Sequence, residues 1–171
     1  SNEQFNQETN NPNQNIHGTH VAGIIAADPN LGSVGGVAPS AKILAGQFIG
    51  NGGGGSLGDA ILAMNSVANK GAKIINMSLG GPEEGKTLEN AMKYAYNSNV
   101  LVVAAMGNNG KKIKNYPASY KNIIAVGATN EKNQIASFSN FGDWISVSSP
   151  GYKIYSTFPS YKVDLTKLGL T

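Results

Sequence analysis

The sequence predicts an α/β fold in which a parallel β-sheet is flanked by helices on both faces. Short apolar stretches typical of buried strands alternate along the chain with longer segments that have helical periodicity. Strands that are apolar throughout need cover on both faces, and alternating helices provide it. The length of 171 residues, a hydrophobic content of 40% and 22 glycines fit one globular domain with many tight turns.

The pattern assigns each element a place in the chain. Residues 1–15 are rich in Asn and Gln and are expected to form a flexible arm or surface loop. A helix is expected to follow directly from this arm. The further expected helices are 56–70 and 86–98, and the expected strands are 42–49, 73–79, 100–105, 123–128 and 144–147.

The first helix places a histidine at its start. Asn15 is a good N-cap, and the residues after His17 are almost all apolar, so we expect a buried helix. The positive end of the helix dipole favours neutral imidazole, the form that accepts a proton from a nucleophile. His17 is therefore a candidate catalytic base. The alternative is a core histidine bonded to a carbonyl group.

Three motifs in the chain carry a family resemblance. His-Gly-Thr-His-Val-Ala-Gly at 17–23 resembles the histidine motif of the subtilisin-like serine proteases. Asn-Met-Ser-Leu-Gly-Gly at 76–81 and Ala-Ala-Met-Gly-Asn at 104–108 resemble two further motifs of that family and follow in its order. The resemblance runs from about Ile16 to Pro159 and implies a subtilisin-like peptidase domain.

The resemblance implies a role for each motif. His17 corresponds to the base, and Asn108 corresponds to the asparagine that binds the oxyanion. The implied substrate-binding residues are Gly53, Gly54 and Gly55 on one edge and Ser78, Leu79 and Gly80 on the opposite edge. Glycine lets an extended polypeptide substrate approach the backbone closely. For Asn108 the alternative is a turn residue before Gly110.

Two catalytic segments of the family have no counterpart in the chain. Residues 1–14 contain no aspartate, and the divergent tail 160–171 contains no Gly-Thr-Ser. The chain is an incomplete piece of a protease, a truncated relative that binds peptides without cutting them, or one half of a split enzyme. We favour the incomplete piece, because both losses fall at the ends while the retained motifs are intact. On each view the 171 residues are expected to be inactive alone, and on the first and the third a further segment or chain would supply Asp and Ser.

A dinucleotide-binding domain is the alternative function. The stretch Gly50–Gly55 satisfies G-x-G-x-x-G between an expected strand and an expected helix. A Rossmann site also needs a carboxylate at the end of the following strand to bind the ribose. The strand expected at 73–79 ends in Ser-Leu-Gly and offers none.

The resemblance bears on metal binding and localisation as well. The implied chemistry needs no cofactor, but the matching loop in the family can hold a structural calcium, and Asn30 stands at that place. Oxygen ligands suit calcium, although the other ligands would come from segments outside this chain, and an ordinary loop is the alternative.

Family members are secreted or extracellular, whereas residues 1–15 are too polar for a signal peptide.

Composition argues against two other classes of partner. The net charge of +3 comes entirely from lysine, and the densest group, Lys111, Lys112 and Lys114, has no interleaved aromatic residues. Arginine is the residue that reads phosphate and guanine with two parallel hydrogen bonds, so a nucleic-acid partner is not expected. No apolar run reaches membrane-spanning length, so a membrane is the second partner that is not expected.

Overall fold

The computed structural model describes residues 16–48 and 55–160. The chain divides into two compact units. We call Ser1–Ala63 with Tyr155–Thr171 the helix unit and Met64–Ile154 the sheet unit. The expectation of a single domain over 1–171 stays a prediction.

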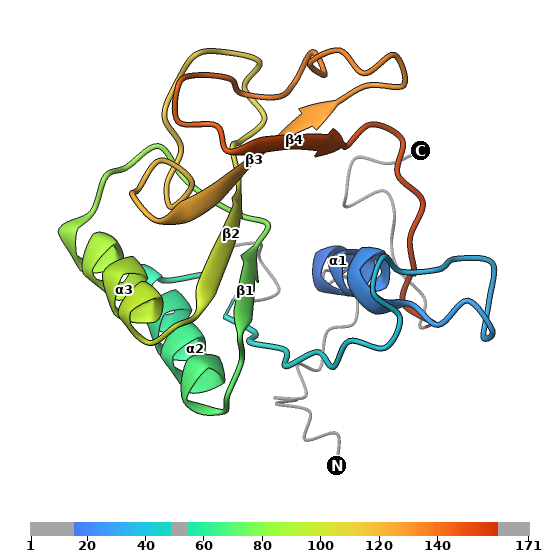
Figure 1. Cartoon of the computed structure of the whole chain (residues 1–171), viewed down its shortest axis with the longest axis horizontal. Helices are drawn as coiled ribbons and strands as arrows, with labels where there is room; N and C mark the ends of the chain where they lie inside the picture. Colours follow the sequence, from blue (N-terminus) through green and yellow to red (C-terminus); the bar gives the residue numbers. More distant parts are fainter. Residues whose placement is uncertain (1–15, 49–54, 161–171) are drawn as a thin grey trace. The chain divides into compact units, whose positions relative to one another are not determined.

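A four-stranded parallel sheet forms the centre of the sheet unit. Its strands follow one another in chain order, as Figure 1 shows: β1 (Ile74–Met77), β2 (Leu101–Ala105), β3 (Ile123–Thr129) and β4 (Val147–Pro150). The predicted parallel α/β fold is thereby confirmed. Because all four strands run in the same direction, the loops that follow them gather at one edge of the sheet.

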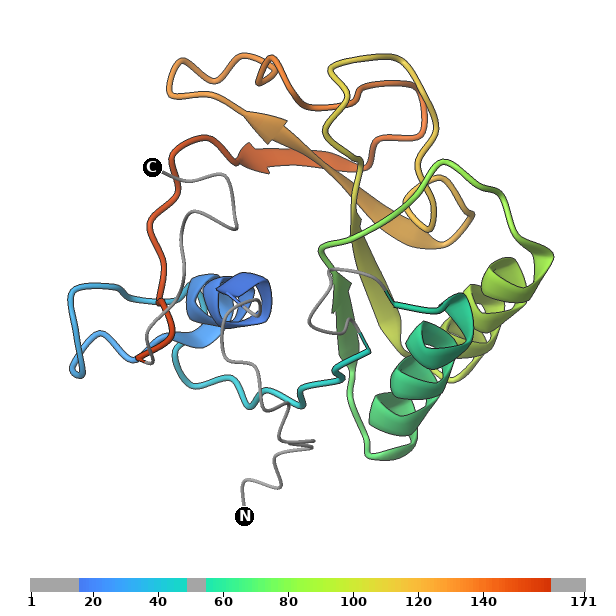
Figure 2. The ribbon, with the colours of Figure 1, turned by 180° about the vertical axis from the view of Figure 1, so that it is seen from behind.

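Helix α3 (Lys86–Asn97) packs on this sheet, beside β2 (Figure 2). Its buried residues are Leu88, Ala91, Met92 and Ala95, which recur at helical spacing along one side. Along β1, Ile75 and Met77 are buried, whereas Ile74 is 62% exposed. Burial therefore alternates between the two faces of the strand. Within the sheet unit, helical cover lies on one of these faces, and the side chains of β1 on the other face are exposed.

Two strand predictions need correction. Residues 42–48, the described part of the expected strand 42–49, form no strand, and Ile43 and Leu44 remain 45% and 43% exposed. An apolar run becomes a strand only when a neighbour satisfies its backbone groups. The strand expected at 144–147 begins at Val147 instead, because a turn closed by the Ile145 N–H and the Gly142 carbonyl occupies the preceding residues.

In the helix unit, α1 (Ile16–Ala26) is an 11-residue helix whose only buried residue is Gly23. The expectation that this helix is wholly buried is therefore wrong for the structure described. Its hydrogen bonds within the unit join it to two other segments. The N–H groups of Val37 and Ala38 donate to its last carbonyl groups, and Ser156 and Thr157 donate hydroxyl hydrogen bonds to carbonyls of its first turns. Figures 1 and 2 show the segment after β4 running beside α1.

Helix α2 (Leu57–Asn69) runs across the boundary between the two units. Ser56 caps it: the Asp59 N–H donates to Ser56 Oγ at 3.0 Å, and Ser56 Oγ donates to the Asp59 carboxylate at 2.7 Å. The first of these bonds satisfies an N–H group in the first turn that would otherwise lack a partner. The observed bounds agree with the predicted helix 56–70 to within a residue at each end.

Candidate active site

The loop after β2 carries Asn108, the predicted oxyanion residue. Gly107 and Gly110 have φ angles of +97° and +64°, which residues with a Cβ adopt only with strain. Asn108 between them is exposed, and its side chain has no hydrogen-bond partner among the described residues. The turn thus presents an amide group whose donors can still bind another molecule.

Buried side chains tie this loop to the rest of the sheet unit. The Asn109 N–H donates to Asn140 Oδ1 at 2.8 Å, and Asn140 Nδ2 donates to the Met106 carbonyl at 2.9 Å. The Gly110 N–H donates to the Phe138 carbonyl at 2.7 Å. The residues around Asn108 are therefore held although they belong to no helix or strand.

The predicted substrate edge follows β1, the strand adjacent to β2. Met77 pairs with Ala104 in the register, so Ser78, Leu79 and Gly80 leave the sheet at the same edge as Asn108. The structure thus brings the predicted edge and the predicted oxyanion residue together within one unit. Next to the edge, Gly81 forms an antiparallel bridge with Tyr116.

Asn115, which the sequence analysis did not single out, lies between these two segments. Its Nδ2 donates to the Ala105 carbonyl at 3.4 Å. A Cβ on Gly80 would lie 2.2 Å from Asn115 Nδ2, and a Cβ on Gly107 would lie 3.2 Å from Asn115 Cγ. Both glycines are therefore needed for this close packing. In the sequence, the one distinctive feature of Asn115 is that it directly precedes Tyr116 and Pro117.

Two tyrosines support the far end of the substrate edge. The Tyr116 hydroxyl donates to Glu84 at 2.9 Å, and Tyr120 Oη bonds both the N–H and the carbonyl of Gly85. Burial raises the pKa of Tyr116, and the hydrogen bond to Glu84 raises it further. The neutral, donating form of Tyr116 is accordingly the stable one.

His17, the predicted base, lies in the first turn of α1 and is exposed. This places its ring at the positive end of the helix dipole, as the sequence analysis expected. The family resemblance also implies that His17 lies close to Asn108, and because α1 belongs to the helix unit this stays a prediction.

The second predicted substrate edge is only partly described. Gly53 and Gly54 lie outside the described residues. Gly55 is described, and a Cβ there would come within 2.6 Å of the Phe48 carbonyl oxygen. A close backbone approach thus requires glycine at this position.

Asn30, the predicted calcium ligand, lies in an exposed turn. Its backbone N–H and its side-chain amide both donate to Asp28 Oδ1 at 2.9 Å. In the described part of the chain no cluster of three or more His, Cys, Asp or Glu side chains stands ready for a metal ion. Calcium takes six to eight oxygen ligands, and its binding at this turn stays a prediction.

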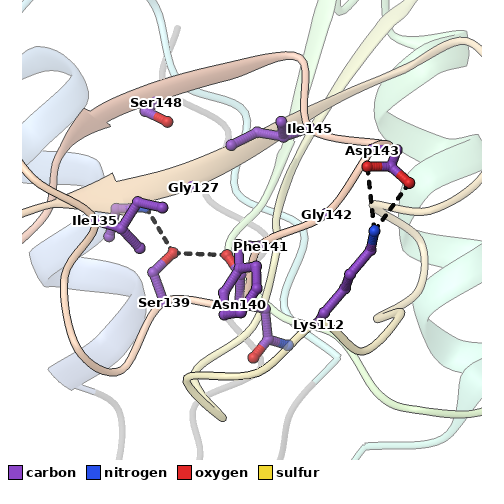
Figure 3. A pocket seen from close by; sticks show the side chains of 11 residues that line it. Lys112, Gly127, Ile135, Ser139, Asn140, Phe141, Gly142, Asp143, Ile145 and Ser148 are labelled. Carbon is purple, nitrogen blue, oxygen red and sulfur yellow. Dashed lines mark hydrogen bonds and ion pairs between the residues drawn. The ribbon is translucent and has the colours of Figure 1, made fainter.

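A hollow in the sheet unit does not have Asn108 among its lining residues. It has a volume of about 490 Å³, and the Lys112–Asp143 ion pair at 3.0 Å stands at its rim (Figure 3). Ile135, Phe141 and Ile145 give it a largely apolar lining. None of the predicted site residues contributes to it.

The structure also bears on the dinucleotide alternative. The residues directly after β1 are Ser78, Leu79 and Gly80, so no carboxylate is available there for a ribose. Most of the glycine stretch, 49–54, lies outside the described residues.

The helices of the described residues are too short or too polar to span a membrane.

Comparison with known proteins gives one consistent family. The model of the subtilase family, Peptidase_S8, matches residues 1–169. The chain is 49% identical over 144 residues to the thermophilic serine proteinase of Bacillus sp. (strain AK1), covering 84% of this chain and 36% of that protein. It is 46% identical over 145 residues to subtilisin Savinase of Lederbergia lenta, covering 85% and 54%. It is 48% identical over 146 residues to the minor extracellular protease Epr of Bacillus subtilis (strain 168), covering 84% and 22%.

A solved structure agrees with this similarity. The psychrophilic subtilisin-like protease of Pseudoalteromonas sp. AS-11 superimposes with a TM-score of 0.80 at 40% identity, covering 85% of this chain and 34% of that one. The chain thus spans about half or less of the length of the relatives it matches.

Proposed function

The chain belongs to the subtilase family, and from this premise we propose that its residues take part in serine endopeptidase catalysis, the hydrolysis of peptide bonds by acyl transfer. The observation that carries the proposal is the loop after β2. An exposed amide that has no hydrogen-bond partner among residues 16–48 and 55–160 is held there between two positive-φ glycines, beside a glycine-containing strand edge. Oxyanion stabilisation requires such a donor, fixed before the reaction begins.

In the proposed reaction, His17 removes the proton from a serine hydroxyl, and the serine oxygen attacks the carbonyl carbon of the substrate. The Asn108 amide donates a hydrogen bond to the oxyanion that forms. His17 then passes its proton to the leaving amine, and water later releases the acyl group by the same route. The serine, and the aspartate that orients the histidine, come from a segment or chain beyond these 171 residues.

The substrate is a polypeptide in extended conformation. Ser78, Leu79 and Gly80 leave the sheet after β1 and offer their backbone groups to one side of it, and we place Gly53, Gly54 and Gly55 on the other side. Main-chain hydrogen bonds of this kind hold any sequence, so they supply affinity and register rather than a strong side-chain preference.

A chimera tests the proposal with a direct readout. Residues 16–159 replace the matching stretch of subtilisin Savinase, whose remaining segments supply the aspartate and the serine. We expect peptide hydrolysis, a loss of about a millionfold in kcat with His17→Ala, and a loss of about a hundred- to a thousandfold with Asn108→Ala; both magnitudes are those seen in a subtilisin. Asn130→Ala, in an exposed turn of the sheet unit, is the control. An active chimera in which Asn108→Ala matches that control would refute the proposed role.

Two further properties belong to this proposal. We place the protein outside the cell, because a relative at 48% identity is named an extracellular protease. Structural calcium near Asn30 would need oxygen ligands beyond those of the described turn, and no catalytic step depends on it. Calcium titration of the chain, followed by thermal unfolding, tests for the ion.

A further inference from the structure

We propose that Asn140 is a positioning residue for the oxyanion donor, an inference that rests on the proposed role of Asn108. Asn140 is 1% exposed and lies 32 positions further along the chain. Its amide binds the backbone on both sides of Asn108.

The hydrogen bonds of Asn140 converge on one loop. Its Nδ2 donates to the Met106 carbonyl at 2.9 Å and to Asn109 Oδ1 at 3.3 Å, and its Oδ1 accepts from the Asn109 N–H at 2.8 Å. Its own backbone N–H donates to the Gly107 carbonyl at 3.0 Å. These bonds involve residues 106, 107 and 109, and they leave the exposed Asn108 between them without a bond to Asn140.

The packing around Asn140 leaves the loop little room to move. A Cβ on Gly107 would come within 2.6 Å of Asn140 Nδ2. An asparagine is costly to bury unless its donors and its acceptor are all satisfied, and here the loop satisfies them. Since an apolar residue of similar volume could fill the same space, the gain from an asparagine is the fixed path of the loop.

Asn140 is itself anchored to the sheet through its neighbour. Ser139 Oγ accepts from the Ala128 N–H at 2.9 Å and donates to the Asn140 carbonyl at 3.0 Å (Figure 3). Ala128 belongs to β3. A continuous set of hydrogen bonds therefore runs from the sheet to the residues flanking Asn108. A donor displaced by about 1 Å can lose on the order of a hundredfold in rate, which is why such a connection matters for catalysis.

The first test needs no catalytic activity. In the full 171-residue chain, NMR relaxation should give ordered backbone amides at 107–109, with order parameters of about 0.85, and Asn140→Ala should lower them to below about 0.6. The matched control is Asn130→Ala: Asn130 Oδ1 also accepts two backbone N–H bonds, from Lys132 and Gln134, in another loop of the sheet unit. Unchanged order at 107–109 in Asn140→Ala would overturn the inference.

The second test separates positioning from general support, using the chimera described above. Asn140→Ala should lower kcat about tenfold with KM unchanged, consistent with the loss of an interaction made in the transition state. The Asn108→Ala, Asn140→Ala double variant should be no slower than Asn108→Ala alone, because the two act as one unit. Asn140→Asp, which keeps the acceptor for Asn109, should fall between wild type and Asn140→Ala, and it replaces the latter if that variant fails to fold.

The outcomes distinguish the two hypotheses. If Asn108→Ala slows catalysis while Asn140→Ala matches the Asn130→Ala control, or if the effects of the pair simply multiply, the positioning role fails and the proposed function stands. If Asn108→Ala itself has no effect, the proposed function fails, and the positioning role fails with it.

Discussion

His17 and Asn108 are held in place by opposite means. His17 sits in a regular helix, where the backbone hydrogen bonds are local and set the direction of the side chain. Asn108 sits in an irregular turn, where the side chain of the distant Asn140 bonds the backbone of Met106 and Asn109. The helix has one buried residue, Gly23, and bonds two other segments of its unit through its carbonyl groups, whereas the turn is bonded on both sides of Asn108. The helix therefore depends mainly on its own backbone hydrogen bonds, whereas the turn depends on bonds to distant residues.

This contrast predicts where each region is fragile. In α1, the sensitive position is Gly23, the one buried residue of the helix, which faces Ser156 and Thr157. In the turn, almost every residue has an assigned partner, so sensitivity is spread over Gly107, Gly110 and Asn140. The following predictions test that difference.

The largest effect is expected for Gly107→Ala. The substitution combines a φ of +97° with a Cβ 2.6 Å from Asn140 Nδ2, and Asn140 is too buried and too well bonded to move aside. We expect a loss of about 2–4 kcal/mol in the free energy of unfolding, measured by urea denaturation. Gly71→Ala is the matched control, since Gly71 has a φ of +90° and nothing within 4 Å of its missing Cβ.

The control should lose only about 1 kcal/mol, the cost of the backbone conformation alone. Equal losses in both variants would mean that the packing of Asn140 against Gly107 contributes nothing, and the contrast between the turn and the helix would then disappear.

A smaller loss is expected for Gly23→Ala in α1. Its Cβ would lie 2.2 Å from Thr157 Oγ1 and 2.8 Å from the Thr157 backbone nitrogen, so the segment that follows β4 must shift. We expect about 1–3 kcal/mol less stability. Gly18→Ala in the same helix meets nothing within 4 Å and should stabilise the helix by about 0.5–1 kcal/mol. Opposite signs in thermal unfolding would confirm that one glycine anchors the helix.

The same contrast explains what the sequence could predict. The order of the elements and the parallel sheet follow from local apolar periodicity, and Asn108 could be placed at the carboxyl edge because that edge is common to all parallel strands. Whether residues 42–48 find a partner strand, and whether α1 is covered, depends on distant segments, and both expectations failed. Asn140 and Asn115 were missed for the same reason, since a buried asparagine has no local signature.

Tyr116, at the substrate edge, provides a pH-dependent test of intermediate size. Its pKa is raised by burial and by Glu84, so its contribution to stability is present below the ordinary tyrosine pKa of 10.0 and is lost as the pH rises through the higher folded value. Tyr116→Phe should cost about 1 kcal/mol near neutral pH and flatten the alkaline decline. Tyr155→Phe, at a position 89% exposed, is the control and should leave the decline as it is. The decline persisting unchanged in Tyr116→Phe would assign it to other groups.

The smallest effect concerns Glu89 on α3, the helix that covers the sheet. Hydrogen bonds from Lys86 Nζ at 2.8 Å and from Lys93 Nζ at 2.6 Å lower the pKa of Glu89 from 4.5 to about 2. A lowered carboxyl pKa stabilises the fold above pH 4.5, and this contribution disappears as the pH falls from 4.5 to about 2. Because the pairs are exposed, the effect should be modest and should shrink in 1 M NaCl. Glu89→Gln should remove that part of the acid dependence, whereas Glu131→Gln, whose partner Lys153 lies 3.6 Å away, should not. Acid unfolding curves that coincide for wild type and Glu89→Gln would show that pairs on the surface of α3 do not influence the sheet that carries the Asn108 turn.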